Sequence, residues 1–188
     1  MLHRFPHYYP AFRCIDGACR DNCCRAGWEI DIDPDTLARY RRVPGELGRR
    51  LDEQIDSSGE APCFRLDREG VCPSLTREGL CELYLRLGPD ALCEICREHP
   101  RFHSWHGPFR ESGLGLCCEE ACRLILTDRA PFALLEQTDP EPEEPAEDPL
   151  FLSRVEEVRR VCFAVAQDRC RTVRQRMQLL LCLGDELQ

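Results

Sequence analysis

The sequence contains no lysine, and all 25 of its strongly basic side chains belong to arginine. No side chain of this protein can therefore form a lysine Schiff base, act as a lysine general base or be modified at a lysine amine. Long apolar runs are also absent, because no stretch approaches the roughly 20 apolar residues that a helix needs to cross a bilayer. The N-terminus lacks the apolar core and the cleavage site of a secretory signal peptide. These absences predict a cytoplasmic protein that does not bind membranes.

Motifs of several common enzyme classes are missing too. The sequence has no glycine-rich nucleotide loop, no nucleophile elbow and no H-E-x-x-H zinc motif. An excess of basic charge is also absent: residues 139–149 hold six acids and no base, and the remainder has 28 acids against 25 bases. This balance gives no electrostatic basis for binding nucleic acid.

Cysteine, in contrast, is abundant, with fifteen residues in a chain of 188. In a secreted disulfide scaffold, an odd number would leave one thiol unpaired. The favoured alternative is a reduced cytoplasmic protein whose thiolates bind metal.

The thiols are densest in residues 14–24, CIDGACRDNCC. Spacings of two to four residues allow one turn to direct several sulfur atoms to a single point. Gly17 is suited to the positive φ of such a turn, and Asp16 tolerates it. This stretch predicts half of a metal site.

Residues 63–81 predict a hairpin or paired loops that contribute further thiols. Two turns, at Arg68-Glu69-Gly70 and Arg77-Glu78-Gly79, are each followed two residues later by a cysteine. Cysteines in tight clusters or delivered by such turns are the ligand candidates: Cys14, Cys19, Cys23, Cys24, Cys72, Cys81, Cys96 and Cys118.

The other cysteines and the histidines allow more than one interpretation. Cys162, Cys170 and Cys182 follow the apolar stripe of a helix and are expected to be core residues. Four cysteines are either ligands or packing residues: Cys63, Cys93, Cys117 and Cys122. Three histidines are either part of a solvated loop or part of a pocket beside Cys96: His99, His103 and His106.

The spacing of the candidate ligands bears on the kind of metal. Zinc sites usually present two C-x2–4-C pairs at a regular interval, whereas here most candidates are scattered singly. Scattered thiolates better suit an Fe–S cluster, whose irons need ligands from several directions. Eight thiols could hold one Fe–S cluster with spare structural cysteines, two clusters, or two zinc ions. We expect an Fe–S cluster of the 4Fe–4S type, with zinc as the alternative.

The patterns predict a mainly α fold: an irregular cysteine-rich metal-binding domain with short strands or a hairpin, plus a long C-terminal helix. The expected domains are a cysteine-rich domain over 1–138, an acidic proline-rich linker over 139–149, and an amphipathic helix over 150–188. The expected elements are a strand over 28–33, helices over 35–43, 46–55, 80–87, 90–99 and from 117, a loop over 101–112, and one helix over 150–183.

Several blocks of the sequence resemble the flagellin lysine-N-methylase family. They cover residues 8–127 in order: YYPAFRCIDGACRDNCCRAGWEIDID (8–33), FRLDREGVCPSL (64–75), GLCELYLRLG (79–88), ICREHPRFHSW (95–105) and ESGLGLCCEEACRLIL (111–126). The pattern from Cys81 to Tyr84 and from Cys96 to Pro100 is also similar to small proteins described as zinc- or iron-chelating domains.

The resemblance implies an enzyme that methylates lysine ε-amines of flagellin, with S-adenosylmethionine as the expected donor and an Fe–S cluster bound by cysteine. The eight ligand candidates match the family's recurrent cysteines. Family members commonly continue into a larger C-terminal helical region, of which residues 150–188 would be the start.

Our main hypothesis is therefore a lysine N-methyltransferase acting on flagellin. The residues assign neither a methyl-donor pocket nor a catalytic base, although Glu119 and Glu120 are placed to attract a cationic lysine. The alternative is a non-enzymatic Fe–S or zinc module with a structural or redox role.

Overall fold

The computed structural model describes residues 1–140 and 148–186, and within them the chain forms seven α-helices and six strands. The chain divides into two compact units, each made of segments that are separated in sequence. Unit 1 comprises Met1–Tyr9, His103–Gly113 and Arg129–Gln188, and unit 2 comprises Pro10–Phe102 and Leu114–Asp128. Residues 1–138, expected to be one cysteine-rich domain, therefore contribute to both units. Most of the expected linker, at 141–147, lies outside the described residues.

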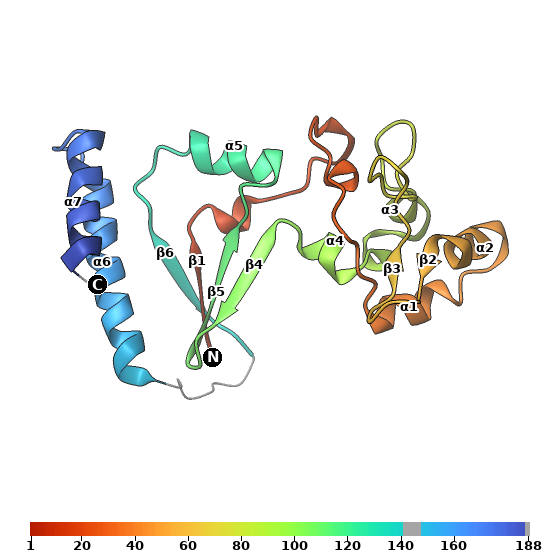
Figure 1. The fold of residues 1–188 in the computed structure, drawn as a ribbon, viewed down its shortest axis with the longest axis horizontal. Coiled ribbons are helices and arrows are strands. Elements are labelled where there is room, and N and C mark those ends of the chain that lie inside the picture. The colour runs from red at the N-terminus through yellow and green to blue at the C-terminus, as the bar shows by residue number, and fades with distance from the viewer. Residues whose placement is uncertain (141–147, 187–188) are drawn as a thin grey trace. The chain divides into compact units, whose positions relative to one another are not determined.

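Unit 1 is built on a four-stranded mixed sheet (Figure 1). Its strands are β1 (Leu2–Pro6), β4 (Arg101–Trp105), β5 (Phe109–Leu114) and β6 (Leu134–Thr138). The order is β4-β5-β1-β6, with β1 parallel to β5 and antiparallel to β6. The N-terminal strand thus lies between two strands that come more than a hundred residues later in the sequence.

The sheet corrects the expectation of a loop over 101–112. This stretch forms β4, a turn in which Gly107 has a φ of 79°, and β5. The polar residues of this stretch give no strand pattern in the sequence. The strands form because β5 pairs with β1, which is distant in the sequence. The chain is still largely helical, as predicted, but the four-stranded sheet was not predicted.

The single long helix expected over 150–183 is also wrong. It is replaced by α6 (Pro149–Gln167) and α7 (Val173–Glu186), which pack against each other (Figure 1). The chain turns after α6 at Asp168, whose side chain accepts a hydrogen bond from the backbone N–H of Cys170 and pairs with Arg171. The apolar residues of the helix predicted over 150–183 follow helical spacing, but the spacing shifts between Val165 and Cys170. This shift is the sequence signal of the turn.

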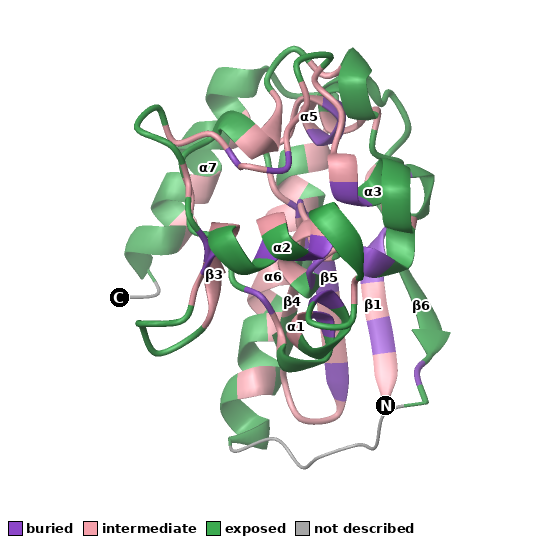
Figure 2. Cartoon of the chain, turned by 90° about the vertical axis from the view of Figure 1, so that its right-hand side faces the viewer, coloured by how far each residue is buried: buried purple, intermediate pink, exposed green. Residues whose placement is uncertain are grey.

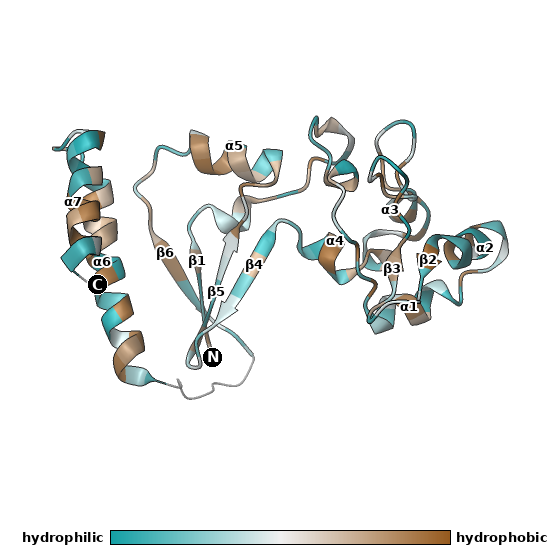
Figure 3. Cartoon of the chain, in the orientation of Figure 1, coloured by the Kyte–Doolittle hydropathy of each residue, from teal (hydrophilic) through white to brown (hydrophobic). Residues whose placement is uncertain are grey.

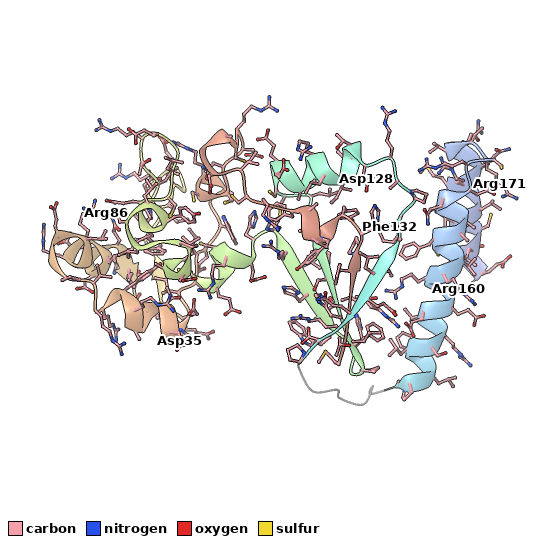
Figure 4. The ribbon with its side chains drawn as sticks, turned by 180° about the vertical axis from the view of Figure 1, so that it is seen from behind. Asp35, Arg86, Asp128, Phe132, Arg160 and Arg171 are labelled. Atoms are coloured by element: carbon pink, nitrogen blue, oxygen red, sulfur yellow. The ribbon has the colours of Figure 1, made fainter. Side chains whose placement is uncertain are left out.

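Hydrophobic residues occur along both helices of this pair, as the hydropathy colouring in Figure 3 shows. One contact joins α6 to the chain before β6, where the rings of Phe132 and Phe163 lie 4.8 Å apart. Figure 4 labels Phe132 beside α6. On its charged side, α6 is held to the sheet by Arg159, which donates to both carboxylate oxygens of Glu111 on β5.

Unit 2 consists of short elements connected by turns. Its helices and strands are α1 (Pro34–Tyr40), α2 (Gly45–Gln54), β2 (Ile55–Asp56), β3 (Cys63–Phe64), α3 (Glu82–Leu87), α4 (Glu94–Glu98) and α5 (Glu119–Thr127). Single 3-10 turns lie at Tyr9–Ala11 (shared with unit 1), Asp16–Ala18, Cys23–Arg25 and Pro89–Ala91.

The helices of unit 2 lie near where the sequence predicts, except that the helix expected over 90–99 is divided into a 3-10 turn at Pro89–Ala91 and the shorter α4. The pair Asp33-Pro34 is typical of a helix start, and Asp33 does cap α1: its side chain accepts the backbone N–H of Thr36 at 2.9 Å, and Pro34 is the first helical residue. The same carboxylate accepts the N–H of Glu94 at 2.8 Å, which ties the start of α4 to the start of α1. The strand expected over 28–33 is reduced to one bridge, between Asp31 and Cys63.

The core of unit 2 combines apolar side chains with thiols. Its most buried members include Tyr40 and Leu51, each 1% exposed, and the expected inward residues of the 28–33 stretch, Ile30 and Ile32. Cys72 and Cys93 are fully part of it, and Cys24, Cys81 and Cys96 pack against it. Figure 2 shows how buried and exposed residues are distributed over the chain. The core therefore places cysteines where most small domains place aliphatic residues.

Across the described ranges, every helix is too short or too polar to cross a membrane.

Candidate metal centre

A cavity of about 450 Å³ lies within unit 2, and nine of the residues that line it are cysteines. All eight ligand candidates from the sequence line it, together with Cys93, whose role the sequence left open. The nine cysteines are Cys14, Cys19, Cys23, Cys24, Cys72, Cys81, Cys93, Cys96 and Cys118. Segments from five parts of the chain thus bring their thiols to one place.

These thiols surround the cavity without meeting at one point. In the described part of the chain, no three cysteine, histidine, aspartate or glutamate side chains converge closely enough to hold a single metal ion. The sharing of one cavity is thus a feature of the structure, whereas the binding of a metal there remains a prediction.

The first cysteine loop is fixed by Asn22. Its side-chain oxygen accepts the backbone N–H of Cys24 at 2.9 Å, and its amide nitrogen donates to the carbonyl of Gly79 at 3.1 Å. One side chain thereby joins the first cysteine loop to the turn that precedes Cys81. The positive φ expected at Gly17 occurs instead at Asp16, with a value of 46°. A Cβ atom at Gly17 would lie 2.9 Å from the end of the Leu80 side chain, which would have to move to make room for it.

A close approach of two glycines brings Cys72 to Cys24. Gly27 and Gly70 both have positive φ, at 72° and 78°, and a Cβ atom on Gly70 would lie 2.8 Å from the Cα of Gly27. Side chains at this point would push the two loops apart. With the loops in contact, the N–H of Cys72 donates to the carbonyl of Cys24 at 2.8 Å.

The glycine turns expected before Cys72 and Cys81 are confirmed. In the first, the carboxylate of Asp67 accepts the N–H groups of Glu69 and Val71, each at 2.9 Å. In the second, Gly79 has a φ of 79°. Each turn leads directly to a cysteine in the cavity wall.

A third pair of thiols lies on α4, where Cys93 is the N-cap residue and Cys96 follows one turn later. Behind them lies Tyr40, whose hydroxyl donates to the carbonyl of Ala91 at 2.6 Å and lies 3.6 Å from the sulfur of Cys93. Burial raises the pKa of the Tyr40 hydroxyl, with the nearby Cys93 adding to the effect. Tyr40 is therefore a neutral donor that holds the start of α4.

Hydrogen bonds among neighbouring thiols shift their acidity. The thiol of Cys24 is hydrogen-bonded to both Cys23 and Cys72, which lowers the pKa of each of these two to about 7. The pKa of Cys24 itself is raised by the same contacts. On α4, a hydrogen bond from Cys96 lowers the pKa of Cys93. Part of the cluster is thus ready at neutral pH to present thiolates, the form that binds metal.

Cys19 differs from these thiols, because burial raises its pKa to about 11. It lies 3.6 Å from the carboxylate of Glu119, which is at the start of α5. That carboxylate accepts the backbone N–H groups of Arg20 and Asp21 at 2.7 and 3.3 Å, which ties the first cysteine loop to α5. Glu119 is therefore a structural link.

The neighbouring Glu120 is also engaged. It is buried and forms a two-pronged ion pair with Arg123, at 2.7 and 2.6 Å. Both acids that the sequence suggested for attracting a substrate lysine are thus occupied by contacts within the protein.

The three histidines noted in the sequence separate in the structure. His99 lines the cavity, and its ring packs against that of Trp28 with the ring centroids 5.0 Å apart and the planes tilted by 42°. His103 lies on β4 in unit 1, hydrogen-bonded to Ser112 at 2.6 Å, and His106 lies in the following turn. Only His99 therefore supports the interpretation of a pocket beside Cys96.

The structure also tests the predictions made for the cysteines outside the cavity. Of the four left open, Cys63, Cys117 and Cys122 are absent from the cavity wall. Of the three expected in a helical core, Cys162 is half-buried, whereas Cys170 and Cys182 are exposed, so the core prediction is wrong for these two.

Sequence reasoning missed three contributors to the site: Trp28, Asn22 and Tyr40. Trp28 donates from its indole nitrogen to the carbonyl of Cys23 at 2.8 Å and packs on His99. For Asn22 a signal was present, since it lies inside the cysteine cluster and asparagine commonly caps turns. No signal marked Tyr40, because its partners lie some fifty residues away.

The fold and this cavity define a cysteine-rich protein with a thiol-lined pocket. Compared with curated proteins, the chain is 30% identical to the lysine-N-methylase of Salmonella typhimurium over 139 residues, which are 71% of this chain and 34% of that protein. The lysine-N-methylase of Salmonella choleraesuis gives the same identity and coverage. The flagellar biosynthetic protein FliU of Salmonella muenchen is 29% identical over 138 residues, 70% of this chain and 81% of FliU.

These relatives confirm the resemblance to the flagellin lysine-N-methylase family. The chain spans about a third of the length of the curated lysine-N-methylases that it matches. No family model matches it, and no solved structure gives a significant match.

Proposed function

We propose that this protein takes part in the N-methylation of flagellin lysines, with an Fe–S cluster held by the cysteines of the unit 2 cavity and S-adenosylmethionine as methyl donor. The observation that carries the proposal is the gathering of nine cysteines around one cavity in a chain related to lysine-N-methylases. The cavity, at about 450 Å³, also falls within the usual size range of small-molecule pockets.

The donor set suits an Fe–S cluster better than a lone zinc ion. Thiolates are soft ligands of the kind that both centres use. A single ion needs its ligands to converge, which they do not do in the described residues. A cluster of several irons takes thiolates from separated directions, which matches nine thiols distributed around a cavity. The residues that would hold it are the eight sequence candidates and Cys93, and when bound it would supply one-electron redox chemistry.

The protein's own residues would contribute a dry, shaped site. Apolar side chains such as Phe12, Ile30, Phe64 and Leu83 line the same cavity as the thiols and are almost fully buried. Methyl transfer to an amine requires a neutral nitrogen aligned with the donor's sulfonium, so exclusion of water and positioning are the contributions expected of such a wall.

The test is a methylation assay with chain purified without oxygen, S-adenosylmethionine and flagellin that carries lysine. Because this protein has no lysine, every methyl-lysine found by peptide mass spectrometry must come from the substrate. We expect methylated flagellin lysines with the natural chain, loss of the signal with Cys23→Ser/Cys24→Ser, and an unchanged signal with Cys170→Ser, which alters an exposed thiol of unit 1. Unmodified flagellin with cluster-loaded protein would exclude catalysis by this chain alone.

One observation favours a second candidate, a non-enzymatic metal module. The relative that this chain covers over most of its length, FliU, bears the name of a flagellar biosynthetic protein. In that case Cys23→Ser/Cys24→Ser would cost metal and stability, and no preparation of the chain would methylate flagellin. The same assay, run with metal analysis, separates the two candidates.

A further inference from the structure

Helix α4 carries two cysteines of the cavity wall, and the residue at its C-terminal end, His99, is a third potential ligand. Cys93, Cys96 and His99 follow one another at intervals of three residues, and backbone hydrogen bonds of the helix run from Cys96 and Arg97 to Cys93 and from His99 to Ile95. Positions three apart lie on the same face of a helical turn. All three side chains accordingly line the cavity.

His99 has a nitrogen atom that the protein leaves without a partner. Its Nε2 is buried and makes no hydrogen bond to any described residue. Leaving such a group unsatisfied destabilises the fold, so a buried nitrogen without a partner in a cavity wall indicates a ligand. Trp28, whose ring packs against the imidazole, does not satisfy it, because its indole N–H is already donated to the carbonyl of Cys23.

The charge state of His99 also suits coordination. Burial lowers the pKa of this imidazole below its ordinary value of 6.5, so the ring is neutral at pH 7 and a nitrogen lone pair is free. Neutral imidazole is the commonest protein ligand of metals and combines readily with thiolates.

We propose that Nε2 of His99 is a nitrogen ligand of the metal centre, beside the thiolates of Cys93 and Cys96 on α4. The inference rests on the proposed function only in requiring that the cavity binds a centre with more than one metal atom, because these three side chains do not converge on a single ion. It does not depend on methyl transfer.

X-ray absorption spectroscopy on the full chain tests it, because the method reports the atoms around either metal. The samples are protein purified without oxygen and protein reconstituted with ferrous iron and sulfide. We expect a shell of sulfur at about 2.3 Å and a light-atom shell at about 2.0–2.1 Å, with the multiple scattering of an imidazole ring. His99→Phe keeps a ring against Trp28 and should lose the imidazole signal while keeping the sulfur shell.

A matched control is His106→Ala, which removes a histidine from unit 1 that does not line the cavity. It should leave the spectrum unchanged. Circular dichroism shows whether each variant is folded. If His99→Phe does not fold, His99→Gln is used in its place.

The outcomes separate this inference from the proposed function. A metal with sulfur neighbours only, or an imidazole signal that survives in folded His99 variants, overturns the role of His99 and leaves the metal centre intact. Absence of both iron and zinc from the natural chain overturns the metal centre, and the ligand role of His99 with it.

Discussion

The two units of this protein are organised by different chemistry. Unit 2 contains twelve of the fifteen cysteines, and its core mixes thiols with apolar side chains around a cavity. Unit 1 contains only Cys162, Cys170 and Cys182, and is built on a sheet and a helix pair. Unit 2 therefore buries thiols, which pack as small apolar groups and can also bind metal.

Unit 1 instead contains a hydrogen-bonded network of polar side chains, of which His3 and Ser112 are buried. A chain of hydrogen bonds crosses all four strands: His103 of β4 to Ser112 of β5 at 2.6 Å, Ser112 to His3 of β1 at 2.7 Å, and His3 to Gln137 of β6 at 3.2 Å. The order of the bonds follows the order of the strands. The contrast is that these polar groups of unit 1 have partners within the sheet, whereas the thiols of unit 2 line a cavity.

The largest expected difference comes from removing thiols in each unit. Cys23→Ser/Cys24→Ser should abolish most metal binding, at least tenfold by elemental analysis, because it removes the donor that links Cys23 to Cys72 as well as two ligands. Cys170→Ser should leave metal content unchanged and alter stability by no more than about 0.5 kcal/mol, since this thiol is exposed. Equal metal loss in both variants would remove the distinction between the units.

A second test concerns the contact between the two glycine loops. Gly70→Ala should destabilise unit 2 by about 3 kcal/mol, because the added Cβ meets the backbone of Gly27 at 2.8 Å and the φ of 78° is strained for alanine. Gly79→Ala is the matched control, having nearly the same φ and nothing within 4 Å, and should cost about 1 kcal/mol. Denaturant unfolding measures both, and similar costs would show that the close approach does not matter.

The hydrogen-bond chain of unit 1 offers the converse test. Ser112→Ala leaves nitrogens of His3 and His103 without their shared partner and should destabilise the protein by about 1–3 kcal/mol. Metal content per folded molecule should not change, because these residues lie in unit 1. A fall in metal content in the folded variant would show that the units are coupled.

The smallest expected effect distinguishes two thiols within the cavity. In metal-free protein, alkylation of Cys23 should rise with a midpoint near pH 7, because its hydrogen bond from Cys24 favours the thiolate. Cys19, whose pKa burial raises to about 11, should react slowly up to pH 9. Cys23 has the lowered pKa, so its contribution to folding is present above the unfolded value and is lost as pH falls through 7. Peptide mapping after brief iodoacetamide treatment gives both curves, and coincident midpoints would contradict the thiol network.

Local signals in the sequence were sufficient for most helices and turns of unit 2, but not for its strands. The cap at Asp33, the glycine turns before Cys72 and Cys81, and the stop at Gly88 each depend on neighbours within a few residues. The grouping of the cysteines followed from the same turns. The role of Cys93, as ligand or as packing residue, could not be decided from the sequence. Its position in the cavity wall depends on the hydrogen bond by which Asp33 at the start of α1 holds the start of α4.

Unit 1 could not be predicted in this way, because its order comes from distant partners. Strand β1 pairs with β5 and β6, more than a hundred residues away, and neither short nor polar strands carry a strong periodic pattern. The turn at Asp168 was visible only as a slip in the apolar repeat. The lack of a hydrogen-bond partner at Nε2 of His99 could not be predicted either, because the sequence equally allowed a solvated loop there.

The central claim is that the nine cysteines lining the cavity of unit 2 surround an Fe–S cluster. Its most direct test is to purify the chain without oxygen and to measure iron, acid-labile sulfide, zinc and the visible spectrum on one sample. We predict a brown protein with iron and sulfide in matching amounts and little zinc. A colourless protein with stoichiometric zinc, or with neither metal, would contradict it.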